Sequence, residues 1–214
     1  MTRYDAAIFD LDGLLLDTER LAIAAGYEVL DSMALPRIDG LFESLVGKDE
    51  VTGARIIAKL YGEAFPLAEF GGLWTARFSA RLDQGISLRP GATELLDHLT
   101  GIGLPRAVAT SSQRASATRK LAQTGLTHHF AAIVTFDCVR QPKPAPDPYL
   151  LAAERLGADP ARCIAFEDSD TGAEAARAAG MTVVQVPDML TTDGPHAHHL
   201  APDLLSGARM AGLF

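Results

Sequence analysis

The sequence predicts an α/β fold in which a Rossmann-like parallel sheet forms the core and an α-helical cap domain is inserted. Short apolar runs alternate with helical patterns along most of the chain, which is typical of a parallel sheet covered on both faces. One interval near the N-terminus holds helical patterns but no convincing strand. We therefore assign residues 1–16 and 87–214 to the core and residues 17–86 to the cap.

Five apolar runs are expected to form the strands of the core. They are AAIF at 6–9, RAVAT at 106–110, AAIVTF at 131–136, CIAFE at 163–167 and TVVQV at 182–186. In a sheet of parallel strands the carboxyl ends lie at one edge, and ligands bind there. Polar residues that follow these runs are therefore the candidates for a functional site.

Helical patterns lie between the strands. Apolar residues at 92, 95, 96 and 99 recur at the spacing of one helix face, and further helices are expected over 114–125 and 148–157. The first of these two helices is expected to have Ser112 as its N-cap and to end at Gly125. The second is expected to have Pro146 or Asp147 as its N-cap and to end at Gly157.

The cap interval contains three helical patterns and leaves the core directly after the first strand. The patterns cover residues 19–33, 49–62 and 68–82. An insertion at that point is expected to lie over the carboxyl edge of the sheet, so we interpret it as a lid that opens for exchange and closes to exclude water.

Composition narrows the class of protein. Hydrophobic residues make up 48% and charged residues 21%, as in ordinary globular proteins, and the net charge of -8 offers no basic field for nucleic acid. No apolar stretch reaches the ~20 residues that a membrane span needs, and the first apolar run is too short for a signal peptide. We expect a cytoplasmic monomer with no nucleic-acid or membrane partner.

The cysteines and clustered histidines give no sign of a site. Cys138 and Cys163 form no CxxC motif, so we interpret both as inert thiols. His196, His198 and His199 lie among Pro and Gly residues, which predict a loop that lacks the fixed geometry of a metal site.

The first strand runs directly into Asp10, Leu11, Asp12 and Gly13. Side chains two apart on an extended chain point the same way, so both carboxylates would face one pocket, and Gly13 permits a sharp turn after them. At a separation of ~4 Å and an effective dielectric near 20, two such charges repel by about 4 kcal/mol. The pair therefore needs a counter-ion or a shared proton.

Other strand ends supply the complementary groups. These are Thr110, Ser111 and Ser112 before a helix, Lys143 between two prolines, and Glu167 with Asp168. Singly, each has an ordinary explanation as a turn, cap, surface charge or acidic helix start, but their joint order favours a site. Carboxylate oxygens without soft ligands favour Mg²⁺ over zinc or copper, and hydroxyls with helix-start N–H groups suit phosphate.

These motifs resemble those of the haloacid dehalogenase-like (HAD) superfamily, in the branch of beta-phosphoglucomutase, phosphoglycolate phosphatase and pseudouridine 5'-phosphatase. The matching segments are FDLDGLLLDTER, RPGATELLDHL, VATSS, KPAPDPYL and FEDSDTGAEAARAAGM, which span nearly the whole chain in order. The resemblance implies a Rossmann-like core with a helical cap inserted after the first strand.

The resemblance also implies a role for each motif residue. Asp10 would be the nucleophile that forms an aspartyl-phosphate, and Asp12 the acid that protonates the leaving oxygen and then activates water. The remaining implied groups are Thr110 and Ser111 for phosphate, Lys143 for charge neutralisation, and Asp10, Asp168 and the Asp12 carbonyl for Mg²⁺. Glu167 would act through water at the metal, and Ser169 as a cap or support.

The function implied is a Mg²⁺-dependent phosphatase acting on a small phosphorylated metabolite, a sugar or nucleoside monophosphate. An acid at Asp12 favours phosphate esters over haloalkanoates, since a halide leaves without a proton. A phosphosugar mutase is an alternative, although Ala22 stands where the mutases carry a histidine. A non-catalytic phosphometabolite sensor is a second alternative, but it would not need a proton-donating aspartate.

Substrate choice is expected in the cap, because the core groups recognise only the phosphoryl group that all substrates share. The resemblance places Thr18 with Asp17 at the hinge where the cap departs. Gly47 and Lys48 lie in a cap loop that often faces substrate in this branch. Lys48 either meets a second polar group of the substrate or is a solvated surface lysine.

Overall fold

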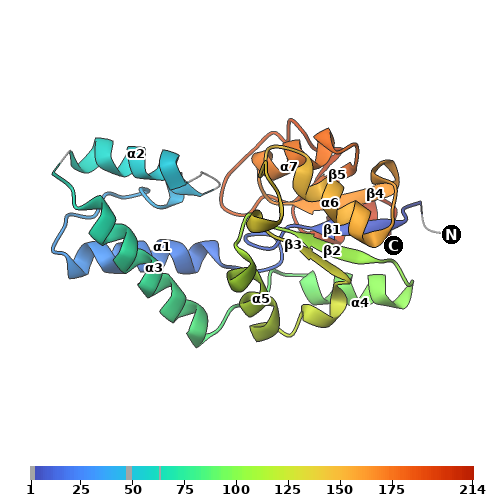
Figure 1. The fold of residues 1–214 in the computed structure, drawn as a ribbon, viewed down its shortest axis with the longest axis horizontal. Coiled ribbons are helices and arrows are strands. Elements are labelled where there is room, and N and C mark those ends of the chain that lie inside the picture. Colours follow the sequence, from blue (N-terminus) through green and yellow to red (C-terminus); the bar gives the residue numbers. More distant parts are fainter. Residues whose placement is uncertain (1–2, 47–49, 63) are drawn as a thin grey trace. The chain divides into compact units, whose positions relative to one another are not determined.

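The computed structural model describes residues 3–46, 50–62 and 64–214, and it divides into two compact units. One unit comprises Met1–Asp17 and Ser87–Phe214, and the other comprises Thr18–Ile86. Figure 1 shows the strands in the first unit and a group of helices in the second. No helix in the described part of the chain is long and apolar enough to cross a membrane.

The first unit is built on a six-stranded parallel sheet, which confirms the predicted α/β class. Its strand order is β3-β2-β1-β4-β5-β6, so β1 lies between β2 and β4. The strands are β1 (Ala6–Phe9), β2 (Arg106–Ala109), β3 (Ala132–Val134), β4 (Cys163–Glu167), β5 (Thr182–Gln185) and β6 (His199–Leu200). The chain runs outward in both directions from β1, and such a switch point is where open α/β sheets bind ligands.

The predicted loop holds for His196 and His198, whereas His199 begins strand β6. His198 donates its backbone N–H to the Val183 carbonyl and Ala201 donates to Gln185, which pairs this segment with β5. Two residues are too few for any alternation of apolar and polar side chains to show in the sequence.

Helices and short 3-10 turns connect the strands. They are α4 (Ala92–Gly101), α5 (Arg114–Gln123), η2 (Thr127–His129), η3 (Phe136–Cys138), α6 (Asp147–Leu156), η4 (Pro160–Arg162), α7 (Asp170–Ala178) and α8 (Leu204–Met210). Pro146 is the N-cap of α6, and Gly157 ends that helix in the left-handed region, as predicted. The prediction of Ser112 as a cap is wrong: Gln113 is the N-cap of α5, because the Ser112 hydroxyl donates to Asp12 instead.

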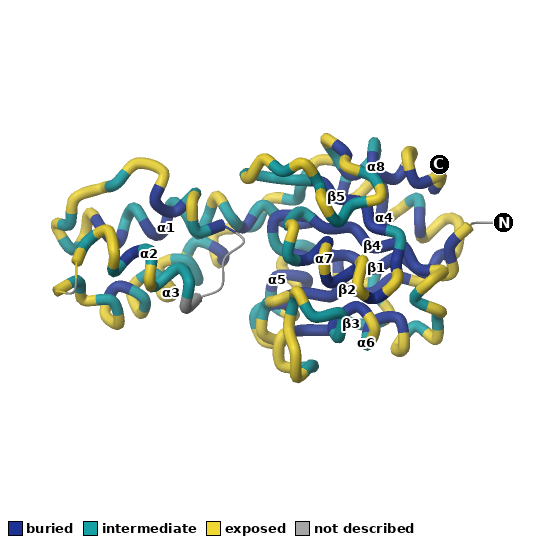
Figure 2. The backbone as a smooth tube through the Cα atoms, turned by 90° about the horizontal axis from the view of Figure 1, so that it is seen from above, coloured by how far each residue is buried: buried dark blue, intermediate teal, exposed yellow. Residues whose placement is uncertain are grey.

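The two faces of the sheet are occupied by alternate residues of each strand. Ala6 and Ile8 of β1 belong to an apolar cluster with side chains of α6 and α7. Phe9 points to the opposite face, where its ring stacks on Phe166 with centroids 4.9 Å apart. Figure 2 shows the central strands as buried along their length. By this alternation the residue after Phe9 returns to the face of α6 and α7.

The second unit has its own apolar core. It contains α1 (Glu19–Ser32), η1 (Glu43–Leu45), α2 (Glu50–Tyr61) and α3 (Leu67–Gln84). Phe42 and Phe70 lie at its centre with Trp74 packed against them. A Cβ at Gly26 would lie 2.5 Å from the Phe42 ring, so α1 needs a glycine where this ring packs.

Candidate active site

Three carboxylates meet at the carboxyl ends of β1 and β4. These strands pair with Phe9 beside Phe166, so the residues that follow, Asp10 and Glu167, lie next to each other on the same face. Asp10 also donates its backbone N–H to the Phe166 carbonyl at 3.0 Å. One carboxylate oxygen from each of Asp10, Glu167 and Asp168 lies within 4.8 Å of the others.

Lys143 places a buried ammonium between two of these carboxylates. Its Nζ donates to Asp10 Oδ1 at 2.6 Å and to Glu167 Oε1 at 2.5 Å, and its side chain is 5% exposed. The ammonium also lies 5.1 Å from the centroid of the Tyr149 ring, within the range of a cation–π contact. The segment before α6 and the first turn of α6 thus supply two of the groups that contact Glu167.

Glu167 is fully buried and is held from three sides. Besides Lys143, Tyr149 donates its hydroxyl to Oε1 at 2.5 Å, and Ser169 donates its hydroxyl to Oε2 at 3.2 Å. Ser169 is the N-cap of α7 and accepts the backbone N–H of Gly172 at 3.1 Å. A Cβ at residue 172 would lie 1.9 Å from Glu167 Oε1, so the carboxylate occupies the space that a side chain there would fill.

Burial and charge perturb the ionisation of this cluster. Burial is the largest influence on Asp10 and raises its pKa to about 7, with the Glu167 and Asp12 charges adding to the rise and Lys143 opposing it. Burial alone would lower the pKa of Lys143, but the Asp10 and Glu167 carboxylates raise it overall. The pKa of the Tyr149 hydroxyl is raised, mainly by burial, so it stays a donor.

The cluster fits a divalent cation. When all three carboxylates are ionised, the single ammonium of Lys143 leaves two negative charges uncompensated in a region with little water. The donors are hard oxygen atoms, which bind Mg²⁺ or Ca²⁺ in preference to softer metals. A divalent ion at this point would supply the missing positive charge.

Asp12 has a separate set of partners. Lys120 Nζ donates to Asp12 Oδ1 at 2.6 Å, and Ser112 Oγ donates to Oδ2 at 2.7 Å. Gly13 follows with a φ of +84° and donates its N–H to the Leu16 carbonyl, which closes the turn after β1. The sequence interpretation missed Lys120, whose only signal is its place at the buried helix spacing of Ala117 and Leu121.

The predicted phosphate-binding residues follow β2, the strand beside β1. Thr110 is 2% exposed; its hydroxyl accepts the Ser112 backbone N–H at 3.1 Å, and its own N–H donates to the Val134 carbonyl. Ser111 is the next residue in this turn and is exposed. The turn therefore places Thr110 and Ser111 at the same sheet edge as Asp10, and the N–H groups of Thr110 and Ser112 already donate to acceptors within the protein.

Comparison with known proteins identifies the family of this chain. The family model of the haloacid dehalogenase-like hydrolases matches residues 7–186. The chain belongs to this family.

Several of the named relatives are phosphatases. The chain is 40% identical to the fructose-1-phosphate phosphatase YqaB of Escherichia coli, over 86% of this chain and 97% of that protein. It is 32% identical to a phosphorylated carbohydrates phosphatase of Thermotoga maritima, over 83% and 82%. The crystal structure of CbbY from Rhodobacter sphaeroides in complex with phosphate superimposes with a TM-score of 0.76 at 28% identity, over 97% and 96%. This haloacid dehalogenase-like protein is a phosphoric monoester hydrolase.

The cap residues predicted from the family resemblance are placed only in part. Thr18 is the N-cap residue of α1 and begins the second unit, whereas Asp17 belongs to the first unit and donates its N–H to the Ser87 carbonyl. Gly47 and Lys48 lie outside the described residues. Roles for these residues in substrate recognition stay predictions.

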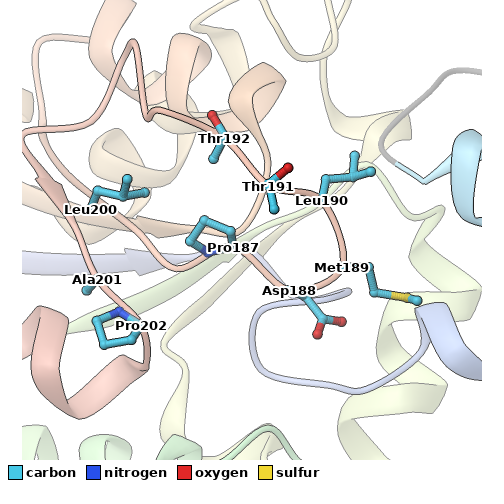
Figure 3. Close-up of a pocket in the computed structure, with 9 residues that line it drawn as sticks. All are labelled: Pro187, Asp188, Met189, Leu190, Thr191, Thr192, Leu200, Ala201 and Pro202. Carbon is cyan, nitrogen blue, oxygen red and sulfur yellow. The ribbon is translucent and has the colours of Figure 1, made fainter.

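A hollow of about 400 Å³ lies beside the loop that follows β5 (Figure 3). Residues 187–192 and 200–202 line it. Its acidic residue, Asp188, is paired with Arg89 Nη1 at 2.6 Å, and the hollow includes none of the three clustered carboxylates. The hollow is therefore separate from the carboxylate cluster.

Proposed function

We propose that this hydrolase is a Mg²⁺-dependent phosphatase that acts on a small phosphorylated metabolite, a sugar or nucleoside monophosphate, through an aspartyl-phosphate. The observation that carries the proposal is the position of Asp10, which is held by the Lys143 ammonium inside a cluster of hard oxygen donors. The named substrates of its relatives, among them fructose 1-phosphate and phosphorylated carbohydrates, support this substrate class.

Asp10 is the proposed nucleophile. Lys143 fixes Oδ1, so we assign the attack on phosphorus to Oδ2, with the bond from phosphorus to the leaving oxygen breaking as the new bond forms. The ammonium offsets negative charge as the phosphoryl group approaches. Thr110 and Ser111, in the turn after β2, would bind the phosphoryl oxygens through a hydroxyl and backbone N–H groups.

Asp12 is the proposed acid and base. It would give a proton to the leaving alkoxide oxygen and later take one from the water that attacks the aspartyl-phosphate, so that one displacement is divided into two easier ones. This exchange of roles returns Asp10 to its starting state and releases inorganic phosphate.

Mg²⁺ is the proposed cofactor. The Asp10 and Asp168 carboxylates and the Asp12 carbonyl would hold it, and its charge would offset that of the phosphoryl group. Glu167 would stay with Lys143 and Tyr149 as the anchor of the ammonium, and Ser169 would hold Glu167 from the start of α7.

The test is release of inorganic phosphate from fructose 1-phosphate, beta-glucose 1-phosphate, uridine 5'-monophosphate and p-nitrophenyl phosphate. We expect activity that EDTA abolishes and Mg²⁺ restores. The Asp10→Asn variant is expected to lose activity by about 10⁴-fold or more, because a covalent nucleophile is removed.

Asp159→Asn is the matched control, since Asp159 is exposed and precedes β4 at the opposite edge of the sheet. It is expected to keep full activity. Full activity of Asp10→Asn would end the proposal, and conversion of beta-glucose 1-phosphate to the 6-phosphate without phosphate release would show a mutase instead.

A further inference from the structure

Lys120 is a buried lysine that the proposed mechanism does not use. It lies in α5, where the buried residues are Ala117, Lys120 and Leu121. This spacing of three and four defines the inner face of the helix, so a charged residue stands at a position that would ordinarily be apolar. A buried ammonium is costly unless it is paired, so its partner is of interest.

The partner of Lys120 is the carboxylate of Asp12. The ammonium donates to Asp12 Oδ1 at 2.6 Å and to Ser112 Oγ at 3.0 Å, while Ser112 Oγ donates to Asp12 Oδ2 at 2.7 Å. The three side chains form a closed triangle in which the hydroxyl both accepts and donates, as its chemistry allows. Each oxygen of the carboxylate is bound by a different donor, so both its position and its plane are fixed.

Asp12 is the more exposed member of its ion pair with Lys120. Its side chain is 23% exposed, compared with 4% for that of Lys120, and it stands in the turn that follows β1. A group that transfers a proton must lie within hydrogen-bond reach of the leaving oxygen, and a misplacement of ~1 Å can cost about 10²-fold in rate. A rigid helix that holds the carboxylate in place would prevent such a loss.

We propose that Lys120 is a positioning residue that, together with Ser112, holds Asp12 where it can protonate the leaving oxygen of the substrate. This inference rests on the proposed phosphatase function and deepens it. It predicts that substitution of Lys120 lowers kcat more for substrates whose leaving group needs a proton. An alkoxide needs that proton, whereas p-nitrophenolate leaves readily without it.

The test measures kcat of the wild-type protein and of the Lys120→Met variant on two substrates. This substitution removes the charge and keeps the length of the side chain. We expect kcat on the best alkyl phosphate of the panel to fall by about 10²-fold, and kcat on p-nitrophenyl phosphate by less than about fivefold. In an Asp12→Asn background, the same substitution should cost less than about threefold on either substrate, because both residues act in one unit.

Leu121→Ala is the matched control for loss of packing, because Leu121 is the buried neighbour of Lys120 on the same helix. A leucine side chain cannot form hydrogen bonds with Asp12 or Ser112. Its effect should be the same on both substrates. Should Lys120→Met fail to fold, Ser112→Ala removes the second contact without leaving a buried charge, and it is expected to show the same bias at about tenfold.

Equal losses on both substrates, or full additivity with Asp12→Asn, would overturn the inference and leave the phosphatase function standing. A wild-type protein without any phosphatase activity would overturn both. The two failures are therefore distinguishable in one set of assays.

Discussion

The two aspartates at the end of β1 are each paired with a buried lysine, but the surroundings of the two pairs differ. The ammoniums of Lys143 and Lys120 have side-chain exposures of 5% and 4%. Lys143 faces Asp10 and Glu167, with Asp168 close by, so negative charge is in excess there. Lys120 faces one carboxylate and one neutral hydroxyl, so its charge is balanced.

This difference in charge balance separates two uses of the same kind of ion pair. An excess of buried negative charge is stable only with a further cation or a proton, and it therefore creates a binding site. A pair whose charges are balanced needs no further cation or proton, and its effect is to hold a side chain in one position. Three experiments test whether the two lysines differ in this way.

The largest effect is expected from Lys143→Met. Removal of one member of a buried ion pair typically lowers the free energy of unfolding by about 3–5 kcal/mol, because the remaining charge is left uncompensated. We expect a loss of this size here. We expect activity to fall by about 10³-fold or more and the melting temperature to drop, with Mg²⁺ recovering part of the loss by binding the native state. Lys120→Met is the matched comparison, and Mg²⁺ should recover little of its loss. Equal recovery in the two variants would contradict the difference in charge balance.

A smaller effect is expected from Gly172→Ala. The new methyl group would meet Glu167 Oε1 at 1.9 Å and force the carboxylate away from Lys143 and Tyr149, at a cost of about 3 kcal/mol. Activity should fall about 10²-fold, since the anchor of Lys143 is displaced. The control is Gly71→Ala in α3, where a Cβ meets no atom within 4 Å and helix propensity predicts a gain of about 0.5–1 kcal/mol. An unchanged Gly172→Ala variant would show that Glu167 has room to move.

The smallest effect is a dependence of stability on pH in the metal-free protein. Burial raises the pKa of Asp10 from 3.8 to about 7, so the folded state binds a proton more tightly than the unfolded chain does. The resulting stabilisation is fully present below about pH 4 and is lost as pH rises through 7.

We expect the free energy of unfolding of the wild type in EDTA, relative to that of Asp10→Asn, to fall by about 2 kcal/mol between pH 5 and pH 7. Saturating Mg²⁺ should reduce this slope, because the metal takes the place of the proton. Denaturant titrations at the two pH values measure these free energies of unfolding. If the difference between the wild type and Asp10→Asn did not change with pH, the cluster would carry no excess charge.

The sequence alone was sufficient to predict which acidic residues meet at the strand ends. Asp10 and Glu167 follow apolar runs whose alternation fixes the face of the sheet, so their approach follows from parallel pairing. The family resemblance confirmed by the comparisons then supplied chemistry that spacing does not contain.

Features that depend on the packing of one element against another could not be predicted in this way. Lys120 was missed because a lysine in a helical pattern reads as a surface residue unless the neighbour of that helix face is known. Ser112 was predicted to be a helix N-cap because a serine before a helix usually accepts a hydrogen bond from a backbone N–H of the first turn. The competing bond to Asp12 comes from a residue 100 positions away in the sequence.

The close contact at Gly172 has a consequence for the engineering of this enzyme. Libraries that target the reacting groups would ordinarily skip a helical glycine that touches no substrate. Yet every side chain introduced there displaces Glu167, and through it the ammonium beside Asp10. Randomisation at residue 172 would therefore lower turnover without changing any of the acidic residues, whereas shortening Glu167 in the same molecule would make room for alanine.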